Sequence, residues 1–431
     1  MKTIRSIAFC LLDLIITANG QSQVIDTLRL IKTIEVPNYS VFDLDTYFDD
    51  NTQLIAYSNS SGSTEGDTLV VFDLKNDSVI SWFKGTDWNF DIAFINDSCL
   101  LYHNWGIDTI YSVSNFTDPV VTSLIYVPQY DFIGGFTLSD DKSRIAASSV
   151  ISGKYQVQLY DFNAEENLAE LIDTFTFTNI PSETELAISD DNSFIALSGG
   201  YGNDTVLLID VTSSETYKIT VTPNQGTYSP SFFKLNGELK LVVGGGYEDG
   251  SIEIIDVATH SFESSVPVFL SYNYSVSVDS GQNYMACGGY NSEIRVLKIG
   301  DNEFTTVFSD TPGLINKIKF SNDNKFLVAG LGAGTAKLVV YEIVYEEPPV
   351  NSLNSNVDEW SIYPVPVVDI LYIDGFKSEA LTELYTLNGN RIRQQKTSGG
   401  KIDLSDLPQG VYLLKVFNSG SILINREIIK L

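Results

Sequence analysis

The sequence predicts an all-β protein with a large repeated region and a small C-terminal domain. A strand pattern rich in β-branched and aromatic residues recurs along the chain, and polar turn residues separate its copies. Further strand-like runs separated by turns fill residues 359–431. The length of 431 residues and the 43% hydrophobic content suffice for one large and one small folded domain.

The first 20 residues have the three parts of a secretory signal peptide. Two basic residues, Lys2 and Arg5, precede an apolar run over residues 7–18, and small residues stand just before Gln21, where a signal peptidase would cut. The run is shorter than the roughly 20 residues that a membrane-spanning helix needs. We therefore expect residues 1–20 to be a signal peptide that is removed during export.

Residues 21–345 repeat one supersecondary unit. Seven copies of the strand pattern have matching positions 39 to 49 residues apart: VVFDL, TIYSV, VQLYDF, VLLIDV, IEIIDV, IRVLKI and LVVYEI. In each complete unit a hairpin precedes the repeated strand, and a polar turn and another apolar run follow it. Four antiparallel strands at this spacing are typical of one blade of a β-propeller.

The number of strands predicts how the ring of blades closes. The last unit has no fourth strand before Pro348, whereas an unused strand, TLRLIKTIEV at 27–36, precedes the first unit. If this strand completed the last blade, it would cover an exposed sheet edge. We therefore predict a seven-bladed β-propeller over residues 21–345, closed by residues 27–36.

The motif Gly-Gly-Tyr occurs three times, beginning at Gly199, Gly245 and Gly288. A phosphate-binding glycine loop would be expected once, between a strand and a helix N-terminus. Each of these copies instead stands between two predicted strands. We therefore interpret the glycines as turn residues that permit unusual backbone angles, and the tyrosines as the residues to test for binding.

The acidic charge is concentrated in the repeated region. The whole chain has a formal net charge of −29. Residues 21–345 hold 43 acidic and 16 basic residues, whereas residues 359–431 hold eight of each. Because an acidic body repels phosphate backbones and anionic lipid, no nucleic-acid partner is expected.

The small number of histidines limits the acid–base and zinc chemistry that the chain could support. There are two histidines, His103 and His260, so no Ser-His-Asp or Cys-His arrangement is suggested and a zinc site lacks ligands. The paired acids that begin at Asp140 and Asp190 stand in predicted hairpin turns, where Asp favours the backbone geometry. We expect no catalytic residue, no metal and no cofactor, although carboxylate-only chemistry stays open.

Aromatic residues gather in the loops predicted at one end of the blades. Loops between the second and third strands of a blade lie on the same face as loops between blades. Flat amphipathic rings there suit stacking on sugars or holding an extended peptide, or they pack between neighbouring blades. The candidate ligand-binding residues are Trp88, Trp105, Tyr130, Tyr201, Tyr228, Tyr247, Tyr272 and Tyr290, and Tyr274 belongs to the same set.

From about residue 24 to 345 the chain resembles the WD-repeat and lactonase-like propellers. Runs such as SDDKSRIA and SNDNKFLVAG carry this resemblance, although the Trp-Asp dipeptide of true WD repeats is absent. The resemblance implies architecture and not function. We favour non-catalytic binding of a glycan or protein by the aromatic loop face, and the alternative is a secreted lactonase-like or carboxylate-dependent hydrolase.

A polar, proline-bearing linker over residues 346–358 leads to a small domain over residues 359–431, predicted as an antiparallel β-sandwich. Its runs WSIYPVPVVDILYI, LYTLNGNRI, IDLSDLPQGVYLLKV and REIIKL resemble the C-terminal sorting domain of proteins exported by the type IX secretion system. The matching positions are Tyr363, Pro364, Pro366, Asp369, Leu371, Leu384, Tyr385, Leu387, Gly389, Asp403, Leu404, Leu407, Gly410, Tyr412 and Lys430. Val365 stands where that family usually has asparagine.

The resemblance of the tail implies a route and its partners. It implies export by the type IX machinery, removal of the tail, and release or attachment to surface lipopolysaccharide. The expected location is therefore outside a bacterial cell or on its outer surface. The tail residues would serve recognition by the export machinery and not chemistry.

Overall fold

The chain divides into two compact units, Met1–Tyr345 and Glu346–Leu431. The computed structural model describes residues 25–36, 40–60, 68–84, 90–104, 108–127, 132–152, 154–177, 185–200, 203–222, 226–245, 250–268, 273–290, 293–300, 304–308, 313–332, 336–345, 361–363, 365–374, 380–386, 391–397, 400–418 and 421–431. The predicted signal peptide, residues 1–20, and the predicted linker, residues 346–358, lie outside these ranges. Within these ranges the regular elements are strands, and none is a helix long and apolar enough to cross a membrane.

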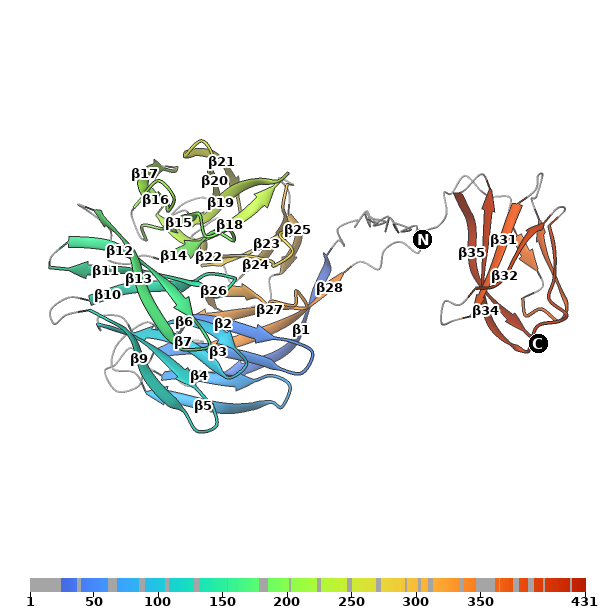
Figure 1. The fold of residues 1–431 in the computed structure, drawn as a ribbon, viewed down its shortest axis with the longest axis horizontal. Coiled ribbons are helices and arrows are strands. Elements are labelled where there is room, and N and C mark those ends of the chain that lie inside the picture. The colour runs from blue at the N-terminus through green and yellow to red at the C-terminus, as the bar shows by residue number, and fades with distance from the viewer. Residues whose placement is uncertain are drawn as a thin grey trace, which may run out of the picture. The chain divides into compact units, whose positions relative to one another are not determined.

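The described part of the first unit forms seven four-stranded antiparallel sheets (Figure 1). Three of them are made of β2 (Ser40–Phe48), β3 (Gln53–Ser60), β4 (Thr68–Asp73) and β5 (Ser78–Lys84); of β6 (Phe90–Asn96), β7 (Cys99–Asn104), β8 (Thr109–Ser114) and β9 (Val120–Tyr126); and of β10 (Phe132–Leu138), β11 (Arg144–Ile151), β12 (Lys154–Asn163) and β13 (Leu168–Phe177). Three more are made of β14 (Leu186–Ile188), β15 (Phe194–Leu197), β16 (Thr205–Asp210) and β17 (Glu215–Thr220); of β18 (Thr227–Leu235), β19 (Glu238–Gly245), β20 (Ser251–Asp256) and β21 (Ser261–Pro267); and of β22 (Asn273–Val278), β23 (Tyr284–Gly289), β24 (Ile294–Lys298) and β25 (Phe304–Phe308). The last has the order β26 (Leu314–Phe320), β27 (Phe326–Gly332), β28 (Lys337–Tyr345) and β1 (Ile25–Glu35).

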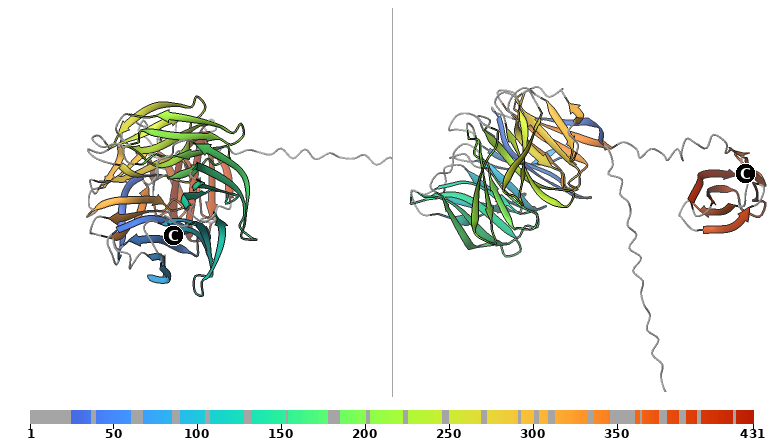
Figure 2. Two further views of the ribbon diagram at one scale, coloured as in Figure 1. Left: turned by 90° about the vertical axis from the view of Figure 1, so that its left-hand side faces the viewer. Right: turned by 90° about the horizontal axis from the view of Figure 1, so that it is seen from above.

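The first strands of the seven sheets form a closed series. In turn, β2 contacts β6, β6 contacts β10, β10 contacts β14, β14 contacts β18, β18 contacts β22, β22 contacts β26, and β26 contacts β2. The colours in Figure 2 accordingly run from blue through green and yellow to orange, and the blue and orange strands lie side by side. We call these seven strands the inner strands.

The hydrophobic core of this unit is divided among the gaps between neighbouring sheets. Within the described residues, seven buried clusters each combine side chains of two adjacent sheets, and together they occupy all seven gaps. Leu100 and Leu101 show why the strands are apolar on consecutive positions. They point to opposite faces of β7, and both are fully buried because one packs against the preceding sheet and the other against the following sheet.

The N-terminal strand β1 completes the last sheet. It pairs antiparallel with β28, with Leu28 opposite Ile343 and Ile34 opposite Leu338. Leu28 is buried in the cluster of this sheet, and the Ile25 N–H donates to the Tyr284 hydroxyl at 3.1 Å. β1 thereby covers the edge of β28 that would otherwise carry unpaired backbone groups.

The Gly-Gly-Tyr glycines that the structure describes do not all act as the sequence predicts. Gly200 does have a positive φ of 66°, as a turn glycine would. Gly288, however, lies within β23, where an added Cβ would stand 2.5 Å from Ile315 Cγ2. The interpretation as a turn residue is therefore wrong for Gly288, because this position allows an inner strand of the next sheet to approach closely.

The described part of the second unit forms two small antiparallel sheets that share one core. One sheet has the order β29 (Ser361–Tyr363), β30 (Ile370–Asp374) and β33 (Lys401–Asp403). The other has the order β32 (Arg391–Thr397), β31 (Ala380–Thr386), β34 (Gly410–Asn418) and β35 (Ser421–Lys430). Their buried side chains form one cluster, which includes Leu371 and Ile402 of the first sheet and Leu384 and Leu414 of the second.

Candidate functional site

The inner strands surround a cavity of about 560 Å³ at the centre of the first unit. All seven inner strands contribute to its lining, together with the turns that follow several of them. The lining, as far as the structure describes it, is unusually rich in charge for a protein interior. It includes the acidic residues Asp43, Asp45, Asp91, Asp140, Glu185, Asp190 and Asp279 and the basic residues Lys142, Lys317 and Lys319.

Three of the carboxylates brace one sheet against the next. Asp43 Oδ2 accepts from the Ile92 N–H at 2.9 Å, and Asp45 Oδ2 accepts from the Phe94 N–H at 2.7 Å. Asp91 Oδ2 in turn accepts from the Phe136 N–H at 3.1 Å. Inner strands are sheet edges, and their N–H groups need partners when they are removed from water. The carboxylates supply those partners and are held in fixed positions as a result.

Between β22 and β26, serine hydroxyls in place of carboxylates accept hydrogen bonds from the backbone of the next sheet. Ser275 Oγ accepts from the Ile318 N–H at 3.0 Å, and Ser277 Oγ accepts from the Phe320 N–H at 3.1 Å. Glu185 again uses a carboxylate, which accepts from the Ser229 N–H. The bracing position between neighbouring sheets is therefore filled by acids in some gaps and by serines in others.

Lys317 is enclosed by carboxylates of two other sheets. Its Nζ lies 2.9 Å from Glu185 Oε1 and 3.3 Å from Asp43 Oδ1, and its side chain is 21% exposed. Burial alone would lower the pKa of this ammonium, but the attraction of Glu185 and Asp43 outweighs burial and raises it. Lys317 is therefore charged and locked between its two partners.

Lys319 lies two residues further along β26 and is less enclosed. Its Nζ is 3.3 Å from Asp45 Oδ1, and its side chain is 46% exposed. The attraction of Asp45 is the main cause that raises its pKa. Lys319 lines the cavity, and because an ammonium has three N–H donors, the contact with Asp45 does not use all of them.

Asp43 is the carboxyl with the most altered acidity in the cavity. Burial raises its pKa to about 6, and the neighbouring charges of Asp91 and Glu185 add to this, whereas Lys317 and the Ile92 N–H oppose it. Behind this group, the buried His103 has its Nδ1 3.7 Å from Asp91 Oδ2. Among the described residues, no group of three or more His, Cys, Asp or Glu side chains is placed to hold a metal ion.

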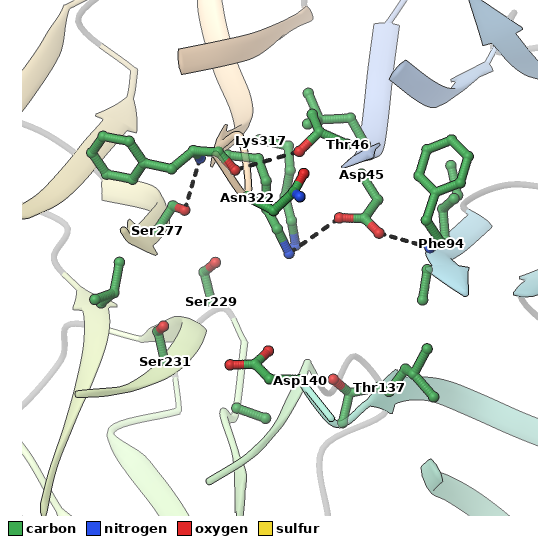
Figure 3. A pocket seen from close by; sticks show the side chains of 18 of the residues that line it. Asp45, Thr46, Phe94, Thr137, Asp140, Ser229, Ser231, Ser277, Lys317 and Asn322 are labelled. Atoms are coloured by element: carbon green, nitrogen blue, oxygen red, sulfur yellow. Dashed lines mark hydrogen bonds and ion pairs between the residues drawn. The ribbon is translucent and has the colours of Figure 1, made fainter. Parts of the chain in front are cut away.

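Hydroxyls and one acid face the lysines across the cavity. Figure 3 shows Lys317 and Asp45 on one side of the space and Thr137, Asp140, Ser229 and Ser231 on the other. The opposite wall comes from β10, the turn after it, and β18. The cavity thus presents ammonium, carboxylate and hydroxyl groups around one space.

The turns after the inner strands form one rim of the cavity. Gln282 Nε2 donates to Asp190 Oδ2, and Gln282 Oε1 accepts from the Lys234 N–H at 2.9 Å. Asp141, next to the lining residue Asp140, accepts from the Ser139 and Ser143 hydroxyls of its own hairpin at 2.7 and 2.8 Å. Burial would raise the pKa of Asp141, but these hydrogen bonds outweigh it and lower the pKa to about 2. Asp141 therefore acts as a turn residue, as the sequence suggested.

Most of the predicted aromatic residues lie outside the described residues, namely Trp88, Trp105, Tyr130, Tyr201, Tyr247 and Tyr272. Tyr228 is described and packs edge-to-face on Tyr274, with ring centroids 5.3 Å apart. Tyr290 is described and 60% exposed. Tyr228 and Tyr290 lie at the ends of their strands opposite to the turns that rim the cavity. The structure thus brings two aromatic rings together and leaves a third accessible.

Sequence reasoning missed the charged lining of the cavity. The signal was present as alternation in two inner strands, where VFDLDTYF places Asp43 and Asp45, and LINKIKF places Lys317 and Lys319, on every second position. Charges that alternate in the first strand of a repeat unit point toward the axis of the ring. What alternation could not show is that Lys317 meets acids from two different sheets.

In the second unit, several residues of the predicted sorting motif are structural. Leu404 is fully buried, Leu407 packs against the same core, and Tyr412 is buried with its hydroxyl donating to the Pro408 carbonyl at 2.8 Å. Asp403 accepts from the Ser405 N–H at 2.9 Å, and Gly410 begins β34. Lys430 is buried, with Nζ 3.9 Å from Asp369 Oδ1.

Other positions of the motif are exposed or not described. Tyr363 is 49% exposed and stacks on Tyr372 with centroids 5.8 Å apart. Pro366 is exposed and follows a cis peptide bond. Pro364 and Gly389 lie outside the described residues.

Fold and sites define an all-β protein with a repeated, acidic first unit and a separate small C-terminal unit. Residues 361–430 match the family described as the secretion system C-terminal sorting domain. The chain therefore carries a type IX C-terminal sorting domain, and this prediction from the sequence is confirmed. Such a domain marks proteins that are secreted or attached to the cell surface, and it implies interaction with the type IX secretion machinery. No curated protein matches the chain.

Proposed function

We propose that the mature protein is an extracellular seven-bladed β-propeller that binds a ligand without transforming it. The seven four-stranded sheets, their closed series of inner strands and the pairing of β1 with β28 support the propeller architecture. The division at Tyr345 supports residues 21–345 as the propeller and residues 359–431 as a β-sandwich sorting domain. Export by the type IX route delivers the propeller to the outside of the cell.

One observation favours binding over catalysis. Asp43, Asp45, Asp91 and Glu185 each use a carboxylate oxygen to hold a backbone N–H of the next sheet. A catalytic carboxylate needs to reach a substrate atom and to exchange a proton. Acids that hold the ring together are instead preorganised groups, which suit recognition of a ligand in a fixed orientation.

The aromatic loop face is the proposed surface for a glycan or protein. Tyr290 supports this proposal because its ring is largely exposed, and exposed rings suit stacking. The test compares the purified wild-type protein with a Trp88→Ala/Tyr130→Ala double variant in a screen of immobilised glycans and cell-surface proteins. We expect the double variant to lose at least tenfold in capture. Unchanged capture would reject the loop face, and the matched control is Trp82→Ala, since Trp82 is 64% exposed on the outer strand β5.

A lactonase-like or carboxylate-dependent hydrolase is the second candidate. The observation in its favour is Asp43, whose pKa of about 6 would suit a general acid or base near neutral pH. Turnover of a lactone or glycoside by the wild-type protein, lost in Asp43→Asn, would favour this candidate.

A further inference from the structure

We propose that the central cavity binds a neutral, polyhydroxylated ligand of saccharide size, and that Lys319 is the lining residue that donates to it. This inference rests on the proposed function, binding without chemical change, and adds a site distinct from the aromatic loop face. The cavity volume of about 560 Å³ lies within the usual range for small-ligand sites, about 300–1,000 Å³.

The distribution of charge argues against an anionic ligand. Seven acidic and three basic residues line the cavity as described, so a carboxylate or phosphate would meet a net negative field. Lys317 is already enclosed by Glu185 and Asp43 and is not available to neutralise an added anion.

The position of the two lysines argues against a cationic ligand beside β26. Lys317 and Lys319 lie two positions apart on β26 and both line the cavity, and the charge of Lys317 acts to lower the pKa of Lys319. A ligand ammonium in this space would be repelled by both. The acids nearest to the lysines, Glu185, Asp43 and Asp45, already pair with them.

A ligand hydroxyl group carries no charge, so it is repelled neither by the acids nor by the lysines of the cavity. It accepts a hydrogen bond from an ammonium and donates one to a carboxylate at the same time. Lys319 lines the cavity and has N–H donors beyond its contact with Asp45. Asp140, Thr137 and Ser231 stand across the space from Asp45 (Figure 3).

The test is titration calorimetry of the full chain against cellobiose, maltotriose, mannobiose and xylotriose, with glucuronate and spermidine as charged probes. We expect at least one neutral saccharide to bind, and Lys319→Met to weaken that binding at least tenfold, as expected for loss of a hydrogen bond to a charged group. The matched control is Lys325→Met, because Lys325 is 62% exposed in the turn after β26 and lies outside the cavity lining. The saccharide affinity of Lys325→Met should equal that of the wild type.

A second variant, Asp140→Asn, keeps the test decisive if Lys319→Met folds poorly, and we expect it to weaken binding severalfold. Binding of a charged probe alone, no binding of any saccharide, or saccharide binding unchanged in both variants would overturn the inference. The bound saccharide is also recovered and weighed by mass spectrometry. Cleavage of it would overturn the proposed function instead, so the two failures are distinguishable.

Discussion

In the seven gaps between neighbouring sheets the side chains are apolar and similar from gap to gap, whereas at the centre of the ring they differ from one inner strand to the next. Leu101 and Ile145 of one gap have close counterparts in others. The centre instead has aspartates on β2, serines on β22 and lysines on β26. The repeated positions therefore specify the architecture, and the positions that depart from the repeat specify what the centre recognises.

Removal of a gap side chain should have the largest effect on stability and none on recognition. Leu101→Ala leaves a cavity between two sheets, and we expect it to lower the free energy of unfolding by about 3–4 kcal/mol, with saccharide affinity unchanged. The measurement is urea unfolding followed by tryptophan fluorescence. The control Leu171→Ala, at a position 53% exposed on β13, should change the free energy by less than about 0.5 kcal/mol. A large change in the saccharide affinity of Leu101→Ala would contradict the assignment of gap residues to architecture and of central residues to recognition.

Lys317→Met should have a smaller but still clear effect on the free energy of unfolding. It leaves Asp43 and Glu185 without their shared cation in a partly desolvated site, and we expect a loss of about 2–3 kcal/mol, below the 3–5 kcal/mol of a fully buried pair because Glu185 is 37% exposed. Lys319→Met serves as its matched partner and should cost less than about 1 kcal/mol, since Lys319 is 46% exposed. Equal losses in the two variants would contradict the assignment of Lys317 to structure and Lys319 to the ligand.

Much of the fold could be predicted from local pattern. Alternation, turn residues and spacing identified the strand units. The last unit lacked a fourth strand and a spare strand preceded the first unit, which indicated that β1 would pair with β28. These features depend on residues close together in the chain. The role of Gly288 was missed because it depends on Ile315 of the next sheet.

The centre of the ring was harder to predict for the same reason. Lys317 and Asp43 are 274 positions apart in the chain and meet only because the ring closes. The sorting domain, in contrast, was recognised from short motifs, several of which are core and turn residues of one small unit, such as Leu404 and Tyr412. A single sequence therefore shows that charged residues are present in the inner strands, but it does not show which of them form pairs across the ring.

We propose that the carboxylates of the cavity hold the ring together and that the cavity binds a ligand without changing it chemically. The most direct measurement is mass spectrometry of the saccharide panel and a lactone after prolonged incubation with the wild-type protein and with Asp43→Asn. The account predicts that every compound is recovered intact with both proteins. Hydrolysis by the wild type that disappears in Asp43→Asn would contradict it and would identify the cavity as an active site.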